Sequence, residues 1–560
     1  MRGHTLWGVS STAPHHNGDR AGADLVAYDT FGYDNVAFRA THADWLCALA
    51  AIHGLGVAGL DDVCVLELGC GRGGNLVAMA DDIPAGTFTG IDHAPSQIAD
   101  GRDLARRAGV ANCTLLAADL VDVAADEHLL GRDRVFDVII CHGVYSWVPD
   151  AVRAAIRSIM ATRLAPTGVA SISFNALPGW HARRIVRDAL RRVVPDGPPA
   201  QMAATAREFL ALWREHGGDA GPLGGFMQHE FDLLDRLSDR YLYFEHLVEH
   251  NQAFYLDEFV RDMAASGLTY LGDADPGTSS PAQLGDDGAE RITALELEAI
   301  ATEQLLDVMT NRFFRRAVLC RAEAHRSAGG AAVMPRLRIG ADVDLATVDV
   351  DLDSRNPAAS AIDAAFIDAD GSTLTPHDPT TATMLWVLSE HRPDTMEVTD
   401  LIAEVARRRS VPIDEVHDDV CELAHELVMR GRCDAGRRDR SLASDIADLP
   451  VARHLARVQA TAGDAVITTG RHDHLAVDTM DRVLLRVMDG TCDHDALLGA
   501  VTTAVAAGEL RITDTDGDPV DSPVDLADLV AAKLERFRIA GVLMRRDGDD
   551  ATRENTASEG

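Results

Sequence analysis

A short apolar run followed by a glycine-rich turn constrains this chain more than any other feature. Residues 63–68 are apolar apart from Glu67, and four of the next six residues are glycine. A helical pattern resumes at Asn75. We therefore predict a buried strand, a tight turn and a helix, with glycine where a Cβ would collide with a cofactor. Open α/β sheets bind nucleotide cofactors at this edge, outside the carboxyl ends of their strands.

Two classes of cofactor compete for this turn. Gly69, Gly71 and Gly74 fit the spacing GxGxxG of dinucleotide-binding folds, which is a weak signal by itself. Glu67 stands two residues before the first glycine, so the run reads Glu-Leu-Gly-Cys-Gly-x-Gly. This run resembles the first motif of class I S-adenosylmethionine-dependent methyltransferases, in which the turn lies against the methionine part of the cofactor. Together with the acids downstream, it favours S-adenosylmethionine over NAD.

Two further acids follow predicted strands. Asp92 ends the strand 87–92, where a carboxylate can accept hydrogen bonds from both ribose hydroxyls. Asp119 follows a third strand and can accept from the adenine amino group. Each acid alone is equally typical of a helix N-cap or a solvated turn, but their order and spacing together favour a cofactor site. Strands at 136–141 and 168–175, with helices between them, predict a Rossmann-like, doubly wound parallel sheet of the α/β class.

Motifs in the first part of the chain complete this pattern. They lie at 28–44 (Tyr-Asp, then Thr-His-x-Asp), 66–75, 142–149 (His-Gly-Val-Tyr-Ser-Trp-Val-Pro), 175–181 (Asn-x-x-Pro-Gly-Trp-His) and 241–260. Together they resemble the bacterial class I methyltransferases that carry a methyltransferase regulatory domain. That family is similar to the rickettsial lysine methyltransferases that act on outer-membrane proteins. The resemblance covers about 25–325, and members of the family carry winged-helix-like modules after it.

The resemblance and the positions of the loops imply a cofactor pocket at the carboxyl ends of the strands. Its predicted members are Tyr28, Glu67, Gly69, Cys70, Gly71, Asn75, Asp92, His93, Gln97, Asp119, Leu120 and Cys141. The aromatic segment that begins at Tyr28 leads into a helix that we expect to be capped at Thr41. This segment either folds back over the cofactor as a lid or covers the end of the sheet.

The 560 residues are too many for one core and suggest three or four domains. A helical regulatory domain is expected after the methyltransferase sheet, with helices over 241–256 and 304–320, followed by winged-helix-like α+β modules. The predicted division is a disordered tail 1–24, N-terminal lid helices 25–60, an S-adenosylmethionine-binding domain 61–199, the regulatory domain 200–325, a linker 326–370, winged-helix-like modules 371–450 and 451–546, and a disordered tail 547–560.

Charge and cysteine usage exclude several classes of function. The net charge of −36 argues against nonspecific binding to nucleic acid or to an anionic membrane, and it favours a basic partner. The winged-helix-like modules lack a basic stripe, so protein interaction or dimerisation is expected there, with a homodimer left open. Nine cysteines without a CxxC pair or a metal-site spacing predict reduced thiols and no metal. Without a signal peptide or a transmembrane run, a cytoplasmic protein is expected.

The methyl acceptor should meet the cofactor beyond the fourth and fifth strands. His142 is a candidate to take a proton at neutral pH, and Tyr145 is a candidate to orient a substrate amine. Trp147 and Trp180 either hold a lysine head by cation–π contact or pack a domain junction. The candidates in these loops are His142, Tyr145, Trp147, Asn175, Trp180 and His181.

Three functions remain open from the sequence. The resemblance implies a methyltransferase that acts on the lysine amine of a protein, and an acidic surface is compatible with a basic substrate. The alternatives are a small-molecule O- or N-methyltransferase and a noncatalytic regulator that binds S-adenosylmethionine. The chain itself contains one lysine, Lys533, so methylation of the protein by itself would fall there, at the N-terminus or on another residue type.

Overall fold

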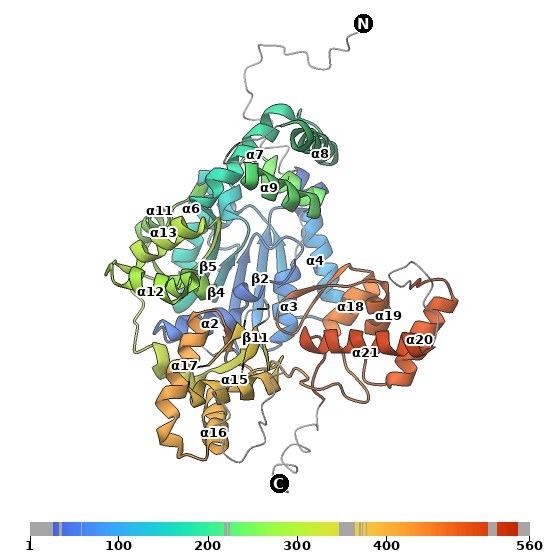
Figure 1. The fold of residues 1–560 in the computed structure, drawn as a ribbon. Coiled ribbons are helices and arrows are strands. Elements are labelled where there is room, and N and C mark those ends of the chain that lie inside the picture. The colour runs from blue at the N-terminus through green and yellow to red at the C-terminus, as the bar shows by residue number, and fades with distance from the viewer. Residues whose placement is uncertain are drawn as a thin grey trace, which may run out of the picture. The chain divides into compact units, whose positions relative to one another are not determined.

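The computed structural model describes residues 26–32, 36–57, 59–217, 221, 224–345, 365–368, 371, 373–376, 378–512 and 523–546. The chain divides into a smaller unit, Met1–Asp34 with His181–Gln252, and a larger unit, Asn35–Trp180 with Ala253–Gly560 (Figure 1). The tails predicted at 1–24 and 547–560 lie outside the described residues.

A single large sheet carries the predicted strands. Its strands β1 (Cys64–Leu68), β2 (Thr87–Asp92), β3 (Cys113–Ala117), β4 (Phe136–Cys141) and β5 (Leu164–Ala176) pair in parallel, in the order β3-β2-β1-β4-β5. The order reverses beside β1, so the glycine-rich turn after β1 lies at the switch point where doubly wound sheets bind ligands. The prediction of a Rossmann-like sheet is confirmed.

Helices cover both faces of the sheet because successive strand residues point to opposite sides. Val65 packs into one core with α2 (Ala43–Ile52), α3 (Gly74–Asp82) and α4 (Pro95–Arg107). Leu66 packs into the other core with α5 (Leu120–Ala125), α6 (Asp150–Arg163) and α11 (Leu256–Ala265). Figure 1 shows α3 and α4 on one side of the strands and α6 and α11 on the other.

The helix expected in a lid is a core element instead. Nine of the ten residues of α2 are buried, including Trp45, whose indole N–H donates to the carbonyl of Ala274 over 2.8 Å. The helix starts later than predicted, because Nδ1 of His42 accepts from the backbone N–H of Asp44 and so caps it. Thr41 belongs to the preceding short 3-10 turn.

Three strands of the region predicted as helical extend the same sheet. Strand β8 (Phe314–Arg321) runs antiparallel to β5, β7 (Leu268–Asp273) runs antiparallel to β8, and β6 (Ala253–Phe254) pairs with β5. The helices expected over 241–256 and 304–320 were therefore too long. The first, α10 (Asp239–His246), ends before β6, and the second, α13 (Ala299–Thr310), ends at Asn311 in the left-handed conformation.

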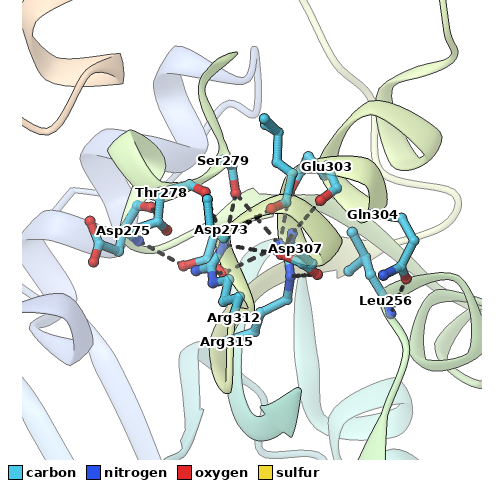
Figure 2. A network of polar contacts seen from close by, with 12 residues as sticks. Leu256, Asp273, Asp275, Thr278, Ser279, Glu303, Gln304, Asp307, Arg312 and Arg315 are labelled. Carbon is cyan, nitrogen blue, oxygen red and sulfur yellow. Dashed lines mark hydrogen bonds and ion pairs between the residues drawn. The ribbon is translucent and has the colours of Figure 1, made fainter. Parts of the chain in front are cut away.

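Buried ion pairs tie β7, α13 and β8 together (Figure 2). The guanidinium of Arg315, which is fully buried, donates to both carboxylate oxygens of Asp307 over 2.8 Å and to Glu303 over 2.8 Å. Arg312 donates to Asp273 over 2.8 Å. A run such as 314–321 reads as helix or strand from the sequence alone, and this pairing decides for a strand.

Two modules follow the sheet within the larger unit. The first contains α15 (Pro379–His391), α16 (Val398–Arg409) and α17 (His417–Met429) on a sheet of β13 (Met396–Glu397), β9 (Arg338–Ala341) and β14 (Cys433–Gly436). Because β9 is the central strand, part of the predicted linker 326–370 belongs to this module. A second small sheet joins β10 (Val343–Leu345), β11 (Phe366–Asp368) and β12 (Thr373–Leu374).

The last module has a core of its own. Four helices, α18 (His454–Ala462), α19 (Thr479–Val487), α20 (His494–Ala506) and α21 (Pro523–Ile539), surround it. Strands β15 (Val466–Thr468) and β16 (His474–Ala476) form an antiparallel hairpin beside them. Helices with a hairpin are the elements that a winged-helix fold requires.

The smaller unit is helical. It contains the part of α7 (Gly179–Val193) that begins at His181, with α8 (Pro199–His216), α9 (Gly224–Arg236) and α10. The buried side chains of Arg183 and Glu230 form an ion pair at 3.3 Å. Tyr28 stacks on Phe244 with ring centroids 4.5 Å apart.

The described residues lack a membrane-spanning helix, a metal-binding cluster and disulfide bonds. No helix in that part of the chain is long and apolar enough to cross a membrane. The same residues contain no group of three or more His, Cys, Asp or Glu side chains that could hold a metal ion. All nine cysteines are described, and each is a free thiol.

Candidate active site

The glycine-rich turn has the backbone that only glycine adopts without strain. Gly69, Gly71 and Gly73 have φ of 78°, 52° and 68°. The N–H of Gly69 donates to the carbonyl of Ile91 over 2.8 Å, which fixes the turn to the end of β2. A Cβ on Gly69 would lie 2.3 Å from Val144 Cγ2, so glycine is required by the loop after β4 as well as by the turn itself.

Glu67 is buried at the end of β1 with one oxygen paired and the other unpaired. Its Oε1 accepts from Nδ2 of Asn75 over 2.9 Å, whereas Oε2 has no hydrogen-bond partner among the described residues. Burial raises the pKa of Glu67 to about 8; the hydrogen bond from Asn75 opposes this rise, and the nearby Asp92 adds to it. A buried acceptor without a donor is costly, so this oxygen indicates a missing partner.

The other two acids lie on the same edge of the sheet. Strand pairing places Leu68 beside Ile91 and Asp92 beside Ala117, so Glu67 and Asp92 lie at the carboxyl ends of β1 and β2, and Asp119 comes two residues after the end of β3. The three acids therefore share one edge of the sheet, and their contact with a cofactor stays a prediction.

Asp92 and Asp119 also make local hydrogen bonds. Asp92 accepts from the N–H of Gly71 over 2.8 Å and from that of Ala94 over 2.9 Å. Each carboxylate oxygen has a second lone pair, so both can still accept from a ligand. Asp119 caps α5 by accepting from Val121 over 2.7 Å and is exposed.

These features fit S-adenosylmethionine. The cofactor combines a ribose with two hydroxyls, an adenine amino group and a positively charged methionine part. Asp92 and Asp119 provide acceptors for the first two, and the unpaired oxygen of Glu67 provides one for the ammonium group. A cation beside Glu67 would favour its ionised form and lower its raised pKa.

The remaining predicted cofactor residues are spread around this edge. Cys141 ends β4 and is fully buried, and Leu120 begins α5. Gln97 is a buried residue of α4, and the His93 ring lies 3.5 Å from the Asp92 carboxylate. Tyr28 belongs to the smaller unit, so its contact with the cofactor stays a prediction.

His142 follows β4 and lies between two aromatic rings. The ring centroids of Phe38 and Phe314 lie 4.5 Å and 5.9 Å from its own. Burial holds the pKa of His142 well below neutral, and the charge of Arg316 adds to this shift. The sequence predicts a histidine that takes a proton near pH 7, whereas this environment keeps the imidazole neutral, because a charged ring is disfavoured there.

Tyr145 is placed in the core instead of at the surface of the site. Its side chain is fully buried against Phe254 and Phe259, and its hydroxyl accepts from Arg157 over 2.7 Å. Burial raises the pKa of Tyr145, and the Arg157 guanidinium partly opposes that rise. The predicted contact with a substrate amine would require this buried hydroxyl to become accessible.

The loop after β5 brings several predicted residues together. Asn175 is buried, its backbone N–H donates to Ser146 Oγ over 2.8 Å, and its Nδ2 has no partner among the described residues. The rings of Trp147 and Trp180 meet edge to face at 5.7 Å. Trp180 is buried and Trp147 half-buried, and both belong to the larger unit, whereas His181 begins the smaller unit.

Asn75 has partners that the sequence analysis did not find. Its Oδ1 accepts from the N–H of Phe38 (3.3 Å), from Oγ1 of Thr41 (3.0 Å) and from Nε2 of His472 (2.8 Å). Thr41 belongs to the motif at 28–44 that carries part of the family resemblance, but His472 lies 397 residues away from Asn75. No local pattern relates positions at that separation.

Comparison with known protein families identifies three parts of the chain. A methyltransferase domain model matches residues 65–168, a model described as a predicted methyltransferase regulatory domain matches 238–321, and a model described as the C-terminal winged helix domain of PKMT matches 448–537. The predicted methyltransferase with a regulatory domain is confirmed, and with it an enzyme that uses S-adenosylmethionine.

Individual proteins resemble the chain over almost its whole length. An uncharacterized protein of Rickettsia prowazekii, RP789, is 26% identical over 94% of this chain and 96% of its own. The structure of PKMT2 from Rickettsia typhi in complex with AdoHcy superposes with a TM-score of 0.78 at 23% identity, covering 91% of this chain and 99% of PKMT2. A second structure of PKMT2 from Rickettsia typhi gives a TM-score of 0.77 at 24% identity, covering 91% of this chain and 100% of that one. These matches confirm the fold class.

Proposed function

We propose that this enzyme transfers a methyl group from S-adenosylmethionine to the side-chain amine of lysine in a protein substrate. The match of residues 448–537 to the PKMT winged helix domain carries the proposal, since PKMT denotes a protein lysine methyltransferase. An enzyme that methylates a small molecule would not require a winged helix domain beside its methyltransferase domain. The similarity in fold to PKMT2 over 91% of the chain supports the same reading.

The charge of the chain suits such a substrate. A net charge of −36 attracts proteins that expose lysine and arginine, and it raises their rate of encounter with the enzyme. We therefore expect the second-order rate constant for a basic substrate to fall as the ionic strength rises, because salt screens long-range attraction.

When bound, S-adenosylmethionine supplies a methyl group on a positively charged sulfur; transfer forms a C–N bond to the amine and breaks the C–S bond, with the electron pair left on sulfur. The residues of the chain mainly bind and orient. Glu67, Asp92 and Asp119 offer acceptors at the edge of three neighbouring strands. The turn beginning at Gly69 holds its shape through backbone hydrogen bonds to the end of β2.

In this proposal the amine arrives between the loops that follow β4 and β5. A lysine amine attacks only after it has lost its proton, and apolar surroundings disfavour the charged ammonium. The rings of Phe38 and Phe314 around His142 provide such surroundings. His142 stays neutral there, so its imidazole can form a hydrogen bond with the amine without adding a positive charge that would repel it.

A labelling experiment tests the lysine acceptor. The purified protein is incubated with S-adenosylmethionine labelled in its methyl group and with a bacterial lysate, half of which has had its lysines blocked by acetylation, which turns each amine into an amide that cannot accept a methyl group. Label in protein bands of the untreated lysate only, assigned to lysine by mass spectrometry, supports the proposal. Label in proteins of both lysates, or only in the small-molecule filtrate, contradicts it.

The scarcity of lysine in the chain provides a control. Lys533 pairs with Asp481 over 2.9 Å, and the variant Lys533→Arg keeps this charge while it removes the last lysine. We expect the variant to label substrate proteins as well as the natural chain does. Binding of AdoHcy without any transfer of label would favour a noncatalytic regulator.

A further inference from the structure

A histidine of the last module contacts the cofactor motif. His472 lies in the turn between β15 and β16, inside the segment that matches the PKMT winged helix domain. Its Nε2 lies 2.8 Å from Oδ1 of Asn75, and Nδ2 of the same amide lies 2.9 Å from Oε1 of Glu67. We propose that His472 is a positioning residue, which orients the Glu67 carboxylate toward S-adenosylmethionine by fixing the Asn75 amide. The inference rests on the proposed cofactor but not on the proposed lysine acceptor.

The chemistry of the donors fixes the direction of every hydrogen bond in this chain of contacts. The oxygen of Asn75 faces the backbone N–H of Phe38, which can only donate, so it must be the carbonyl oxygen of the amide. The amide nitrogen then faces Glu67 and donates to it. Because a carbonyl oxygen only accepts, Nε2 of His472 carries the proton, and the imidazole is the Nε2–H tautomer.

The backbone of His472 is held in an unfavourable conformation. Its φ of 59° lies in the left-handed region, which few residues other than glycine adopt. Its side chain is buried, and Nδ1 has no partner among the described residues. Strained residues persist where the surrounding structure holds them, and they gather at functional sites. In this backbone conformation the ring of His472 contacts Asn75.

Ion pairs clamp the turn on both sides of His472. Arg471 donates to Asp342 over 2.7 Å and to Asp434 over 3.2 Å. Arg39, from the segment before α2, donates to Asp434 over 2.7 Å and also pairs with Asp473. The neighbouring arginines hold the pKa of Asp434 below its usual range despite its burial. The turn is thus fixed to the same chain segment that supplies the Phe38 and Thr41 donors.

Loss of the His472 donor should act on cofactor binding. Without it, the backbone N–H of Phe38 and the Thr41 hydroxyl, which also donates to the Phe38 carbonyl, are left to hold the Asn75 amide, and the amide can rotate away from Glu67. The carboxylate then has to be oriented by the cofactor itself. We expect this to weaken cofactor binding about three- to tenfold, the range of one hydrogen bond, with little change in the rate of the bound complex.

Calorimetric titration of the full chain with AdoHcy tests this expectation. His472→Leu fills a similar volume without a donor, whereas the amide nitrogen of His472→Gln occupies about the place of Nε2 and can restore the hydrogen bond. His474→Gln changes an exposed histidine two residues away and serves as the matched control. We expect weaker binding for His472→Leu, and near-normal binding for His472→Gln and His474→Gln. With any methyl acceptor, KM for S-adenosylmethionine should rise in His472→Leu while kcat stays the same.

Two further measurements separate this role from a purely structural one. In a Glu67→Gln background, His472→Leu should cost less than in the natural chain, because the group it orients has been changed. Binding of AdoHcy to the natural protein should also slow amide hydrogen exchange in the turn 469–473, since coupling between two sites is reciprocal. This second measurement needs no variant to fold.

Defined results would overturn the proposal. They are unchanged AdoHcy binding in folded His472→Leu, a loss in His472→Gln as large as that in His472→Leu, or exchange in the turn that AdoHcy does not slow. If the natural chain binds AdoHcy but labels no lysine, the proposed acceptor fails and the role of His472 stands. If the natural chain does not bind AdoHcy, the role of His472 falls with the cofactor.

Discussion

Asn75 donates to one oxygen of the Glu67 carboxylate over 2.9 Å, and the other oxygen of that carboxylate is buried without a partner among the described residues. The first contact holds the group in one orientation, and the second leaves it a free acceptor at the switch point of the sheet. A carboxylate in this state can bind a cation that carries hydrogen-bond donors, such as an ammonium group. The predictions about Glu67 follow from this relationship.

Replacing Glu67 with glutamine should weaken cofactor binding. The variant keeps the size of the side chain, but it loses the negative charge and turns one of the two oxygens into a donor. A hydrogen bond to a charged partner contributes about 1.5–3 kcal/mol, so AdoHcy should bind about 10- to 100-fold more weakly in a calorimetric titration. Glu127→Gln, at an exposed carboxylate, is the control and should bind normally. Binding of Glu67→Gln within twofold of normal would contradict this role.

The same variant should show a pH-dependent gain in stability without cofactor. Burial raises the pKa of Glu67 from 4.5 to about 8, so the folded protein retains this proton at pH values where the unfolded chain has lost it. Stability is therefore lost as the pH rises from about 4.5 to 8. Glutamine has no proton to lose, so its melting temperature should exceed that of the natural protein by about 2 °C or more at pH 8.5.

Thermal unfolding at several pH values checks this sign. The difference between variant and natural protein should shrink toward pH 5, because both folded and unfolded forms then approach the protonated state. A difference that stays constant with pH would show that Glu67 does not titrate across this range in the folded protein.

Local sequence carried the prediction of the cofactor edge. Glu67, Asp92 and Asp119 each follow a short apolar run, and the carboxyl ends of neighbouring parallel strands necessarily share an edge. The glycines also predicted the turn from local sequence, because a positive φ is a local property of the backbone.

Long-range pairing set the parts that could not be predicted. Strand β8 forms because it pairs with β5 and because Arg315 finds Asp307 and Glu303 around it. Nothing in the composition of 314–321 excludes a helix. The contact of His472 with Asn75 likewise depends on how a distant hairpin packs, which periodicity cannot encode. His142 has an ordinary sequence context, and its burial together with the charge of Arg316 lowers its pKa so that it does not take a proton near pH 7.

Breaking the buried ion pair between Arg315 and Asp307 should strongly destabilise the larger unit. In Arg315→Met the carboxylate of Asp307, which is fully buried, loses both of its hydrogen bonds from that guanidinium. Removing one partner of a buried pair costs about 3–5 kcal/mol, because the other charge stays buried and uncompensated. Denaturant unfolding measures this loss.

An exposed pair provides the comparison. Arg261 and Asp257 pair over 2.8 Å on the surface of α11, and both side chains are more than half exposed. Such pairs contribute about 0–1 kcal/mol, so Arg261→Met should unfold nearly as the natural chain does. Equal effects of the two substitutions would show that burial does not set the contribution of Arg315.

Asparagine at Asp92 and at Asp119 should have unequal effects. Asp92 accepts from two backbone N–H groups, those of Gly71 and Ala94, so an asparagine amide would place its own donor against one of them. The turn then loses a charge-assisted hydrogen bond, and the ribose loses an acceptor. We expect AdoHcy binding at least about tenfold weaker for Asp92→Asn.

Asp119 is an exposed N-cap, and asparagine caps helices as well as aspartate does, so Asp119→Asn should weaken AdoHcy binding less than about threefold. Calorimetric titration of both variants measures the difference, and melting temperatures should fall only for Asp92→Asn. A larger loss of AdoHcy binding at Asp119 than at Asp92 would mean that the adenine contact contributes more to cofactor binding than the hydrogen bond between Asp92 and the glycine-rich turn.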